Sequence, residues 1–356
     1  MVPDFTGYTD LVSQDYNNML NIRQSDIAKK LNVSRITVSK ALRDHPDISQ
    51  EMKEKVLKAA KKMGYVPNLI ATQLNTRKTY TIGIVVPDLE NSFFAFVVDS
   101  MIDFATEKKY HVILTVSREK EIIEQQNVEN LIGMRVDGLL VCLSQETKDK
   151  DIFSRVKKMR IPMVFFDRAF EKIGFPAVVF DDKAGALNAF DQVIGSGYTR
   201  IAHFAGYSSV NIGKRRTSGF KSALRKHRLS LRKNWILEGG FEFKDGYNSF
   251  MKLFQQGELP ELIFTVNDRV ALGAYKAAGE CGIKIPSEIG IFGYGFNETT
   301  DMFLPPLTVI NQNPRKMGQQ AIALLMDIID NNVSGKPADI NIEEEFLWKK
   351  SIHRKE

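Results

Sequence analysis

The chain has 356 residues, of which 43% are hydrophobic and 26% charged, a composition typical of a globular protein with two or three domains. The first twenty residues lack the basic start and apolar centre of a signal peptide. No window reaches the roughly 18 apolar residues of a transmembrane helix, so we expect neither export nor membrane anchoring. Cys142 and Cys281 lack the spaced Cys or His partners of a zinc site or disulfide framework, which fits a reducing cytoplasm.

Positive charge is concentrated near the beginning of the chain. Residues 21–80 contain 13 Lys/Arg and 5 Asp/Glu, whereas residues 1–20 contain three Asp and no basic residue. A basic head on a near-neutral body indicates that the head meets a polyanion. Nucleic acid is the first candidate, and an anionic membrane surface is the second. Residues 1–20 are polar and without periodicity, so they are predicted to form a flexible extension.

Residues 24–43 predict two short helices separated by a turn. Ser25 is expected to cap the first helix, and Asn32 suits the left-handed turn that follows it. Ser34 is expected to cap the second helix. The apolar side chains expected to face one another are Ile27, Ala28, Leu31, Val38, Ala41 and Leu42.

The outward face of the second helix suits the major groove of DNA. Basic groups can bind guanine or phosphate, an aliphatic side chain can contact a thymine methyl, and the Thr37 hydroxyl near the helix start can reach a phosphate. The alternative is the solvated face of an ordinary helical hairpin. The residues predicted to contact DNA here are Ser34, Arg35, Ile36, Thr37, Ser39, Lys40 and Arg43.

A third helix is predicted over residues 49–63 and ends at Gly64. Val56, Ala59 and Ala60 lie on its apolar side, and five lysines lie elsewhere. Such lysines either keep the surface soluble or contact phosphates without reading sequence. The helix completes a three-helix unit.

The motifs SDIAKKLNVSRITVSKAL, GYVPNLIATQL and TIGIVVPD follow one another in this order. Together they resemble the lactose-repressor (LacI) family of bacterial transcription regulators, and the resemblance extends over residues 22–356. It implies a hinge helix that becomes ordered on DNA and lies in the minor groove of a palindromic site, with Asn68, Ala71 and Leu74 at the DNA and Leu74 as the wedge. Asn68 after Pro67 is a good cap, and so short a helix is unstable alone. Alternatively, Leu74 packs on the body as a linker anchor.

From Thr81 onward, short β-rich runs alternate with helical stretches in two series. This alternation predicts an α/β fold of two doubly wound lobes with parallel sheets. The chain is expected to cross between the lobes near residues 180, 310 and 340, as in the periplasmic-binding-protein-like core that the resemblance implies. The predicted parts are a flexible N-terminal extension (1–20), a helix-turn-helix DNA-binding domain (21–67), a hinge helix and linker (68–79), and an effector-binding and dimerisation core (80–356).

A ligand is expected in the cleft between the lobes, at the carboxyl ends of the strands. Aromatic faces there can cover CH or π surfaces, while Asp, Asn and Arg can bind hydroxyl or anionic groups. Sugars, sugar phosphates and purines all remain candidates. The predicted effector-binding residues are Asp88, Asn91, Phe93, Phe94, Ser144, Asp167, Arg168, Arg216, Phe241, Asn267, Asp268 and Phe296.

Several of these residues also have a structural alternative. Phe93 and Phe94 fit a hydrophobic core, Asp167 and Asn267 fit turn caps, and Arg216 fits an ion pair within one lobe. Arg216 and Asn267 are the strongest effector-binding candidates of the set.

The sequence departs from the family at Gly295, where many members carry an Asp that hydrogen-bonds the ligand. This departure leaves open whether Phe296 stacks on the ligand or whether Asn297 and Glu298 reach inward.

No catalytic constellation is found. Gly213-Lys214 lacks the glycine of a phosphate loop, no G-x-S-x-G or H-E-x-x-H motif occurs, and the five histidines are scattered. We therefore expect no enzyme activity, metal or cofactor. The sequence predicts a cytoplasmic repressor that binds a palindromic DNA operator as a homodimer under the control of a small effector, a sugar or a related metabolite. The alternative is a soluble sugar-binding receptor whose basic head contacts proteins.

Overall fold

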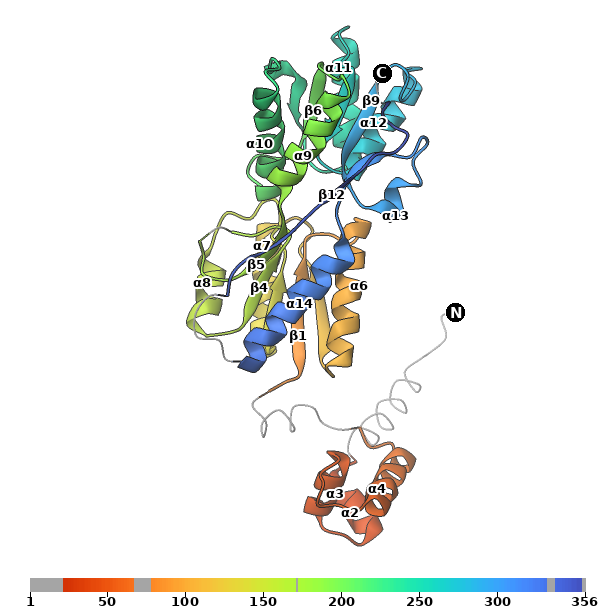
Figure 1. The fold of residues 1–356 in the computed structure, drawn as a ribbon. Coiled ribbons are helices and arrows are strands. Elements are labelled where there is room, and N and C mark those ends of the chain that lie inside the picture. The colour runs from red at the N-terminus through yellow and green to blue at the C-terminus, as the bar shows by residue number, and fades with distance from the viewer. Residues whose placement is uncertain (1–21, 67–77, 171, 332–336, 354–356) are drawn as a thin grey trace, which may run out of the picture. The chain divides into compact units, whose positions relative to one another are not determined.

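The computed structural model describes residues 22–66, 78–170, 172–331 and 337–353 (Figure 1). The chain forms two compact units that separate between Thr79 and Tyr80. The predicted extension (1–20) and the predicted hinge residues Asn68, Ala71 and Leu74 lie outside the described residues. Within the described part of the chain, no helix is long and apolar enough to cross a membrane.

The first unit is a three-helix head. Its helices are α2 (Gln24–Leu31), α3 (Arg35–Leu42) and α4 (Gln50–Met63), and they enclose a small core of Ile27, Ala28, Val38, Ala41, Val56, Ala59 and Ala60. Asn32 ends α2 in the left-handed conformation, with φ 51°, and Gly64 does the same for α4 with φ 71°. Ser34 caps α3, because its hydroxyl accepts a hydrogen bond from the Thr37 backbone N–H at 3.0 Å.

The start of α2 differs from the sequence prediction. Ser25 lies inside the helix, and Arg23 is the capping residue. The Asp26 carboxylate accepts a hydrogen bond from the Arg23 backbone N–H at 2.8 Å. The prediction that Ser25 caps this helix is therefore wrong. The cap lies at Arg23, because Asp26, three positions later, accepts the hydrogen bond of the Arg23 backbone N–H.

The second unit, the core, has two lobes, each built on a six-stranded sheet (Figure 1). In lobe 1 the strand order is β11-β5-β4-β3-β1-β2 and all pairings are parallel. The central strands β3, β4 and β5 are fully buried, as is typical of a parallel sheet covered by helices on both faces. Strand β2, at one edge of the sheet, is only partly buried. The strands are β1 (Thr81–Val86), β2 (His111–Val116), β3 (Gly138–Val141), β4 (Met163–Phe166), β5 (Ala177–Phe180) and β11 (Ile340–Ile342), and the helices are α6 (Ser92–Glu107), α7 (Glu121–Gly133), α8 (Asp151–Lys158) and α14 (Pro314–Asn331).

Lobe 2 has the strand order β12-β10-β9-β8-β6-β7, parallel except for the antiparallel pair of β10 and β12. Its strands are β6 (Ile201–Ala205), β7 (Ile236–Glu238), β8 (Leu262–Thr265), β9 (Gly290–Gly295), β10 (Thr308–Asn311) and β12 (Glu345–Leu347). Its helices are α9 (Asp182–Gly195), α10 (Asn211–Lys226), the short 3-10 helix η1 (Lys233–Trp235), α11 (Phe243–Gln255), α12 (Asp268–Glu280) and α13 (Asn297–Thr300).

Three chain segments connect the lobes. The chain leaves lobe 1 between β5 and α9, returns between β10 and α14, and leaves again between β11 and β12. Helix α14 packs closely on α6, since a Cβ added at Gly318 would lie 2.0 Å from Ser100 Oγ and 2.3 Å from the Val97 carbonyl oxygen. Each of the three connections leaves the carboxyl end of a strand, namely β5, β10 or β11. The carboxyl ends of both sheets therefore border the space between the lobes.

The cap of α2 gives a first testable prediction. Asp26→Ala should destabilise α2 by about 1 kcal/mol, because the Arg23 backbone N–H loses its acceptor. Ser25→Ala is the matched control, and it should have little effect since alanine favours the helix interior. Amide hydrogen exchange in the full-length protein should be about five-fold faster across α2 in Asp26→Ala alone. Equal exchange in the two variants would contradict the cap.

Candidate effector cleft and DNA-recognition helix

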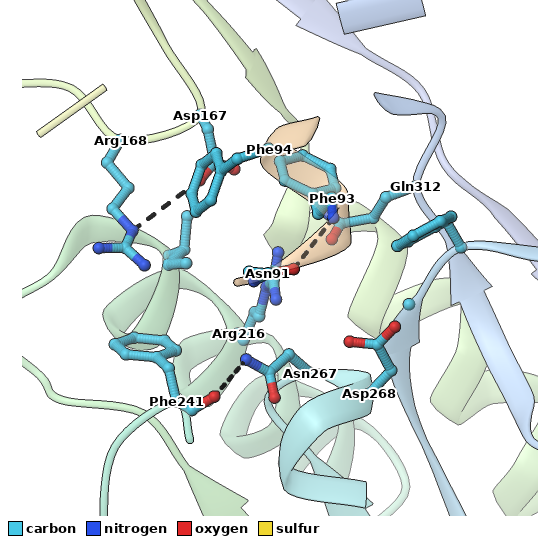
Figure 2. Close-up of a pocket in the computed structure, with 13 residues that line it drawn as sticks. Asn91, Phe93, Phe94, Asp167, Arg168, Arg216, Phe241, Asn267, Asp268 and Gln312 are labelled. Carbon is cyan, nitrogen blue, oxygen red and sulfur yellow. Dashed lines mark hydrogen bonds and ion pairs between the residues drawn. The ribbon is translucent and has the colours of Figure 1, made fainter. Parts of the chain in front are cut away.

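A cavity lies between the two lobes of the core (Figure 2). Most of its lining residues directly follow a strand or begin a helix. Its volume is about 40 Å³, room for about three water molecules. The lining residues are Asn91, Phe93, Phe94, Asp167, Arg168, Ile212, Arg216, Phe241, Asn267, Asp268, Gly295, Phe296 and Gln312.

Ten of the twelve predicted effector residues are thus gathered around one cavity. The two others, Asp88 and Ser144, lie outside the lining. Asp88 accepts hydrogen bonds from the backbone N–H groups of Glu90 and Asn91 and pairs with Arg269 at 2.9 Å. Ser144 is held by buried Glu124. We therefore no longer expect these two side chains to contact a ligand in this cavity.

Arg216 is 2% exposed and is neutralised inside the protein. Its Nε lies 2.7 Å from Asp182 Oδ1, its Nη1 donates to the Val266 carbonyl oxygen at 2.5 Å, and its guanidinium lies over the Tyr294 ring, 3.8 Å from the centroid. The ion-pair alternative therefore describes the contacts of Arg216 within lobe 2. The side chain also lines the cavity, so a ligand would meet a guanidinium whose charge is already paired.

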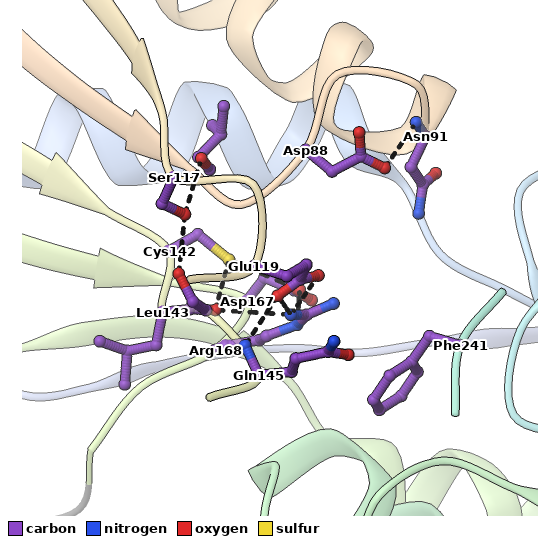
Figure 3. Close-up of polar contacts among 12 residues, drawn as sticks. Asp88, Asn91, Ser117, Glu119, Cys142, Leu143, Gln145, Asp167, Arg168 and Phe241 are labelled. Atoms are coloured by element: carbon purple, nitrogen blue, oxygen red, sulfur yellow. Dashed lines mark hydrogen bonds and ion pairs between the residues drawn. The ribbon is translucent and has the colours of Figure 1, made fainter. Parts of the chain in front are cut away.

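Arg168 is neutralised in a similar way from lobe 1 (Figure 3). Its Nη1 lies 2.9 Å from both carboxylate oxygens of Glu119. Its guanidinium also lies over the rings of Phe94 and Phe241, 5.8 and 5.1 Å from their centroids, and thus links the two lobes.

Asp167 is the carboxylate that faces this cavity from lobe 1. Its backbone is left-handed, with φ 57°, and its nearest cation is Arg168, whose Nε lies 3.9 Å away. Burial raises the pKa of Asp167 to about 6. Asp268 faces the cavity from lobe 2, and burial raises the pKa of its carboxyl also, although Thr299 donates a hydrogen bond to it at 2.8 Å.

The amides of the lining are partly used by the protein. Asn267 caps α12 by accepting from the Val270 backbone N–H at 2.8 Å, and its Nδ2 donates to the Phe241 carbonyl oxygen at 2.9 Å. Its capping alternative is therefore observed. Asn91 Oδ1 accepts from the Phe93 N–H at 3.0 Å, and Gln312 Nε2 donates to Glu344 Oε1 at 3.1 Å.

Phenyl rings fill much of the remaining wall. The ring of Phe296 is buried against Phe93 and Phe96, with centroids 6.4 and 5.4 Å apart. The glycine before it has a structural reason. A Cβ at Gly295 would lie 2.8 Å from Thr300 Cγ2 and 3.2 Å from Asp268 Cβ, so a side chain there would displace its neighbours.

Sequence reasoning missed Ile212 and Gln312 in the lining, and named Gly295 only as a departure from the family. Gln312 follows the end of β10 directly, which was an available signal. No sequence signal pointed to Ile212, because only the packing of α10 in the folded protein places this residue in the lining.

Helix α3 presents the predicted DNA-contacting residues on the head. Ile36 is 69% exposed, and Arg35 is exposed beside it. Lys40 pairs with Asp47 at 2.6 Å, and Arg43 Nη2 donates to Ser39 Oγ at 3.1 Å. The hydroxyls of Ser34 and Thr37 lie 2.8 Å apart at the helix start. Arg35 and Ile36 are thus both exposed, and in the described part of the head the Arg35 side chain forms no hydrogen bond or ion pair.

Both units match known families. Residues 25–68 match the model of bacterial regulatory proteins of the lacI family, and residues 79–350 match that of periplasmic binding proteins and the sugar binding domain of the LacI family. The HTH-type transcriptional repressor PurR of Haemophilus influenzae is 32% identical over 332 residues, which cover 92% of this chain and 97% of that protein. Catabolite control protein A of Priestia megaterium is 29% identical over 331 residues, covering 91% and 99%.

The fold also matches a solved structure. The lac repressor dimer bound to operator and the anti-inducer ONPF superimposes with a TM-score of 0.82 at 23% identity, over 93% of this chain and 98% of that chain. Fold and matches define a DNA-binding transcription regulator with a ligand-binding core. The chain belongs to the lacI family of bacterial regulatory proteins.

Glu124, the residue that holds Ser144, gives a second prediction. It is buried and accepts hydrogen bonds from Ser144 N, Ser144 Oγ and Thr147 Oγ1 at 2.6, 2.8 and 3.0 Å. Burial raises its pKa from 4.5 to about 7. The folded chain then holds a proton that the unfolded chain has lost, so the free energy of unfolding should fall as pH rises from about 4.5 to about 7, by on the order of 2–3 kcal/mol.

Glu124→Gln keeps an acceptor for Ser144 and removes the titration, so this part of the pH dependence should disappear. Urea unfolding across this pH range can be followed by tryptophan fluorescence, which reports on the core because Trp235 and Trp348 both lie there. Equal pH dependence of the wild type and the variant would show that Glu124 does not titrate in this range.

Proposed function

We propose that this regulator is a repressor that binds a palindromic operator as a homodimer, and that a small uncharged effector in the cleft controls its affinity. The observation that carries the proposal is the joint occurrence of helix α3 with its exposed face on the head and a cavity lined by polar and phenyl side chains between the two lobes. A regulator of this kind acts in the cytoplasm and is not an enzyme. Among the residues that the structure describes, no cluster of three His, Cys, Asp or Glu side chains suits a metal ion.

Helix α3 supplies sequence readout in this proposal. Ile36 contacts a thymine methyl, and Arg35 addresses guanine or phosphate. Thr37 and Ser34 at the helix start contact phosphate. Lys40 and Arg43 are held by Asp47 and Ser39, so their charges are positioned before DNA arrives.

The hinge role of Asn68, Ala71 and Leu74 is proposed from the family resemblance alone. Leu74 would open a base step in the minor groove between the two half-sites, which kinks the duplex. Two heads related by the symmetry of a dimer then meet two half-sites of a palindrome.

The operator assay tests the readout. Operator sequences are first selected from genomic fragments bound by the full-length protein. Ile36→Ala should then weaken operator binding about five-fold, since one favourable base contact of about 1 kcal/mol is lost, and leave non-specific binding unchanged. Leu57→Ala on α4 is the matched control, because Leu57 is also an exposed aliphatic residue of the head, at 53%.

The same assay separates the roles of head and hinge. Leu74→Ala should weaken specific binding much more than non-specific binding. Unchanged operator affinity of Leu74→Ala would rule out the wedge, and equal losses in Ile36→Ala and Leu57→Ala would rule out base readout by α3. A protein that shifts no DNA at all would be the sugar-binding receptor considered from the sequence.

The charges of the cleft point to an uncharged effector. Arg168 and Arg216 are paired with Glu119 and Asp182, whereas Asp167 and Asp268 face the cavity. An anionic group would therefore meet carboxylates and no unpaired lining cation among the described residues. Hydroxyl groups that donate to Asp167 and Asp268, on a ring flanked by phenyl groups, fit best. A sugar has this chemistry.

The small cavity implies that the lobes move. Ligand pockets have volumes of roughly 300 Å³ and more, so the described state is closed too tightly for a sugar. Arg269 on α12 of lobe 2 joins Asp88 of lobe 1 at 2.9 Å and also pairs with Glu242 at 2.6 Å. Opening must break the pair with Asp88, and an effector shifts the operator equilibrium only by its different affinity for the two arrangements.

The effector prediction compares neutral sugars with their phosphate esters for release or strengthening of operator binding. A neutral sugar should act and its ester should not, because Asp167 and Asp268 repel the added charge. Asp167→Asn should weaken the effect of that sugar about ten-fold through loss of a charge-assisted hydrogen bond. Asp103→Asn on α6 makes the same chemical change at an exposed site and should have no effect. An active phosphate ester would overturn the charge assignment and leave the operator proposal intact.

A further inference from the structure

A second cavity lies on lobe 2, along α10 and beside the start of α9, whose ribbons lie side by side in Figure 1. Its volume is about 450 Å³, larger than the cleft between the lobes and within the roughly 300–1,000 Å³ of small-molecule sites. All of its lining residues are Lys, Arg, Ser or Thr. They are Lys183, Ser208, Lys214, Thr217, Ser218, Lys221, Ser222 and Arg225, and we call this surface the α10 groove.

The cations of the α10 groove have no ion-pair partner among the residues that the structure describes. Helix α10 contains six Lys/Arg and no Asp/Glu. Two of its cations have acidic partners from α9, since Arg216 pairs with Asp182 and Lys226 with Asp191. In the described part of the chain, the four cations that line the groove have no carboxylate within ion-pair distance. A solvated helix face normally alternates in sign, so the groove carries a concentrated positive potential.

The hydroxyls of the groove divide into two kinds. Thr217 Oγ1 lies 3.1 Å from His203 Nε2, and Ser208 Oγ donates to Glu238 at 3.0 Å, so both are engaged within the lobe. The hydroxyls of Ser218 and Ser222 form no hydrogen bond with any other residue that the structure describes. They lie among the lysines and are free to donate to an anionic oxygen.

We propose that the α10 groove is a binding site for an organic phosphate that carries at least two phosphoryl groups. Lysine, arginine and serine side chains donate hydrogen bonds to phosphoryl oxygens, and the two cations also attract their negative charge. Lys214 and Arg225 are eleven residues apart on one helix, about 16 Å along its axis, so a ligand with linked phosphoryl groups matches this length better than a single phosphate does. Several linked phosphoryl groups can span the intervening Lys221 and its neighbouring hydroxyls.

The lining distinguishes this ligand from a macromolecule. Protein interfaces contain an apolar or aromatic centre, and no lining residue of the groove is apolar. Specific protein–DNA interfaces bury roughly 1,000 Å² or more of protein surface, whereas the groove has a volume of about 450 Å³, which suits a small molecule. Positive charge and hydroxyls without an apolar floor thus favour a polyphosphate metabolite.

The site would communicate with the effector cleft through α10 itself. Ile212 and Arg216 on this helix line the cleft, and Thr217 and Ser218, the next residues, line the groove. Lys183 directly follows Asp182, the partner of Arg216. A ligand that draws Lys183 and Lys214 together would act on both members of the buried pair, so the groove supplies a second, chemically distinct input.

The test uses the full-length protein and sodium tripolyphosphate as the probe, with calorimetric titration at constant ionic strength. Tripolyphosphate should bind once per chain at the groove, at least about ten-fold more tightly than orthophosphate. Lys214→Glu combined with Lys221→Glu should weaken this binding about ten-fold or more, and Lys214→Arg with Lys221→Arg should retain it. Lys233→Glu is the matched control, because Lys233 is an exposed lysine of lobe 2 outside the groove, and its affinity should stay within about two-fold.

The basic head also attracts polyanions, so Arg35→Ala with Lys40→Ala is titrated in parallel. Groove binding should survive in this head variant. Wild-type affinity in the Lys214/Lys221 charge-reversal variant, or loss of binding in the head variant alone, would overturn the proposal. Equal affinities for orthophosphate and tripolyphosphate would overturn the requirement for linked phosphoryl groups. None of these readouts depends on operator DNA or on the effector of the cleft.

Discussion

The buried ion pair of Arg216 and Asp182 is the constraint around which the core is arranged. Asp182 begins α9, directly after the first connection between the lobes, and Arg216 reaches it from α10. Gln312 on the second connection and Glu344 on the third are joined by a hydrogen bond of 3.1 Å. Burial and the neighbouring Asp182 raise the pKa of Glu344, which favours its protonated form beside the pair. All three connections therefore contribute a polar group near one arginine, and removal of one partner would leave a buried charge without compensation.

This arrangement decides what the cleft can bind. Because the charge of Arg216 is already neutralised by Asp182, its guanidinium could orient a ligand but would add little attraction for an anion. Arg168 is held in the same state by Glu119, and its plane stacks on Phe241 of the opposite lobe. Two carboxylates and several phenyl rings remain in the lining, and in the proposed function they would meet the ligand. In the proposed function, specificity would arise from hydroxyl groups of the effector that reach Asp167 and Asp268, and closure of the lobes would determine how strongly those contacts are made.

Helix α10 links two different chemistries on lobe 2. One side places Ile212 and Arg216 in the cleft, and the other lines the α10 groove with cations that have no carboxylate partner in the described part of the chain. The head also has a buried side and an exposed side. Its seven core residues are small or aliphatic, whereas the aliphatic side chain of Ile36 remains exposed. Exposed aliphatic surface is unfavourable in water, and in the proposed function contact with a thymine methyl would remove it.

Local sequence determined most of the secondary structure of this protein. Asn32, Ser34 and Gly64 are capping residues because their backbone or side-chain chemistry satisfies helix ends within a few positions. Alternating strands and helices also predict the convergence of strand ends, because parallel strands share one carboxyl edge. Only the tertiary structure decided which residues pair across that edge. Asp182 with Arg216 and Glu119 with Arg168 are 34 and 49 residues apart, and no local pattern records such contacts.

The tertiary structure also drew Asp88 towards Arg269, placed Ile212 and Gln312 in the lining, and left no space for a side chain at Gly295 beside Thr300. At the start of α2, by contrast, a local signal was present, since Asp26 lies three residues after the capping residue Arg23 and accepts a hydrogen bond from its backbone N–H. Periodicity and capping act over one or two helical turns, so the sequence alone determined the elements and their order. Charge neutralisation and close packing act between residues far apart in the chain, so only the folded structure decided the chemistry of the cleft and of the α10 groove.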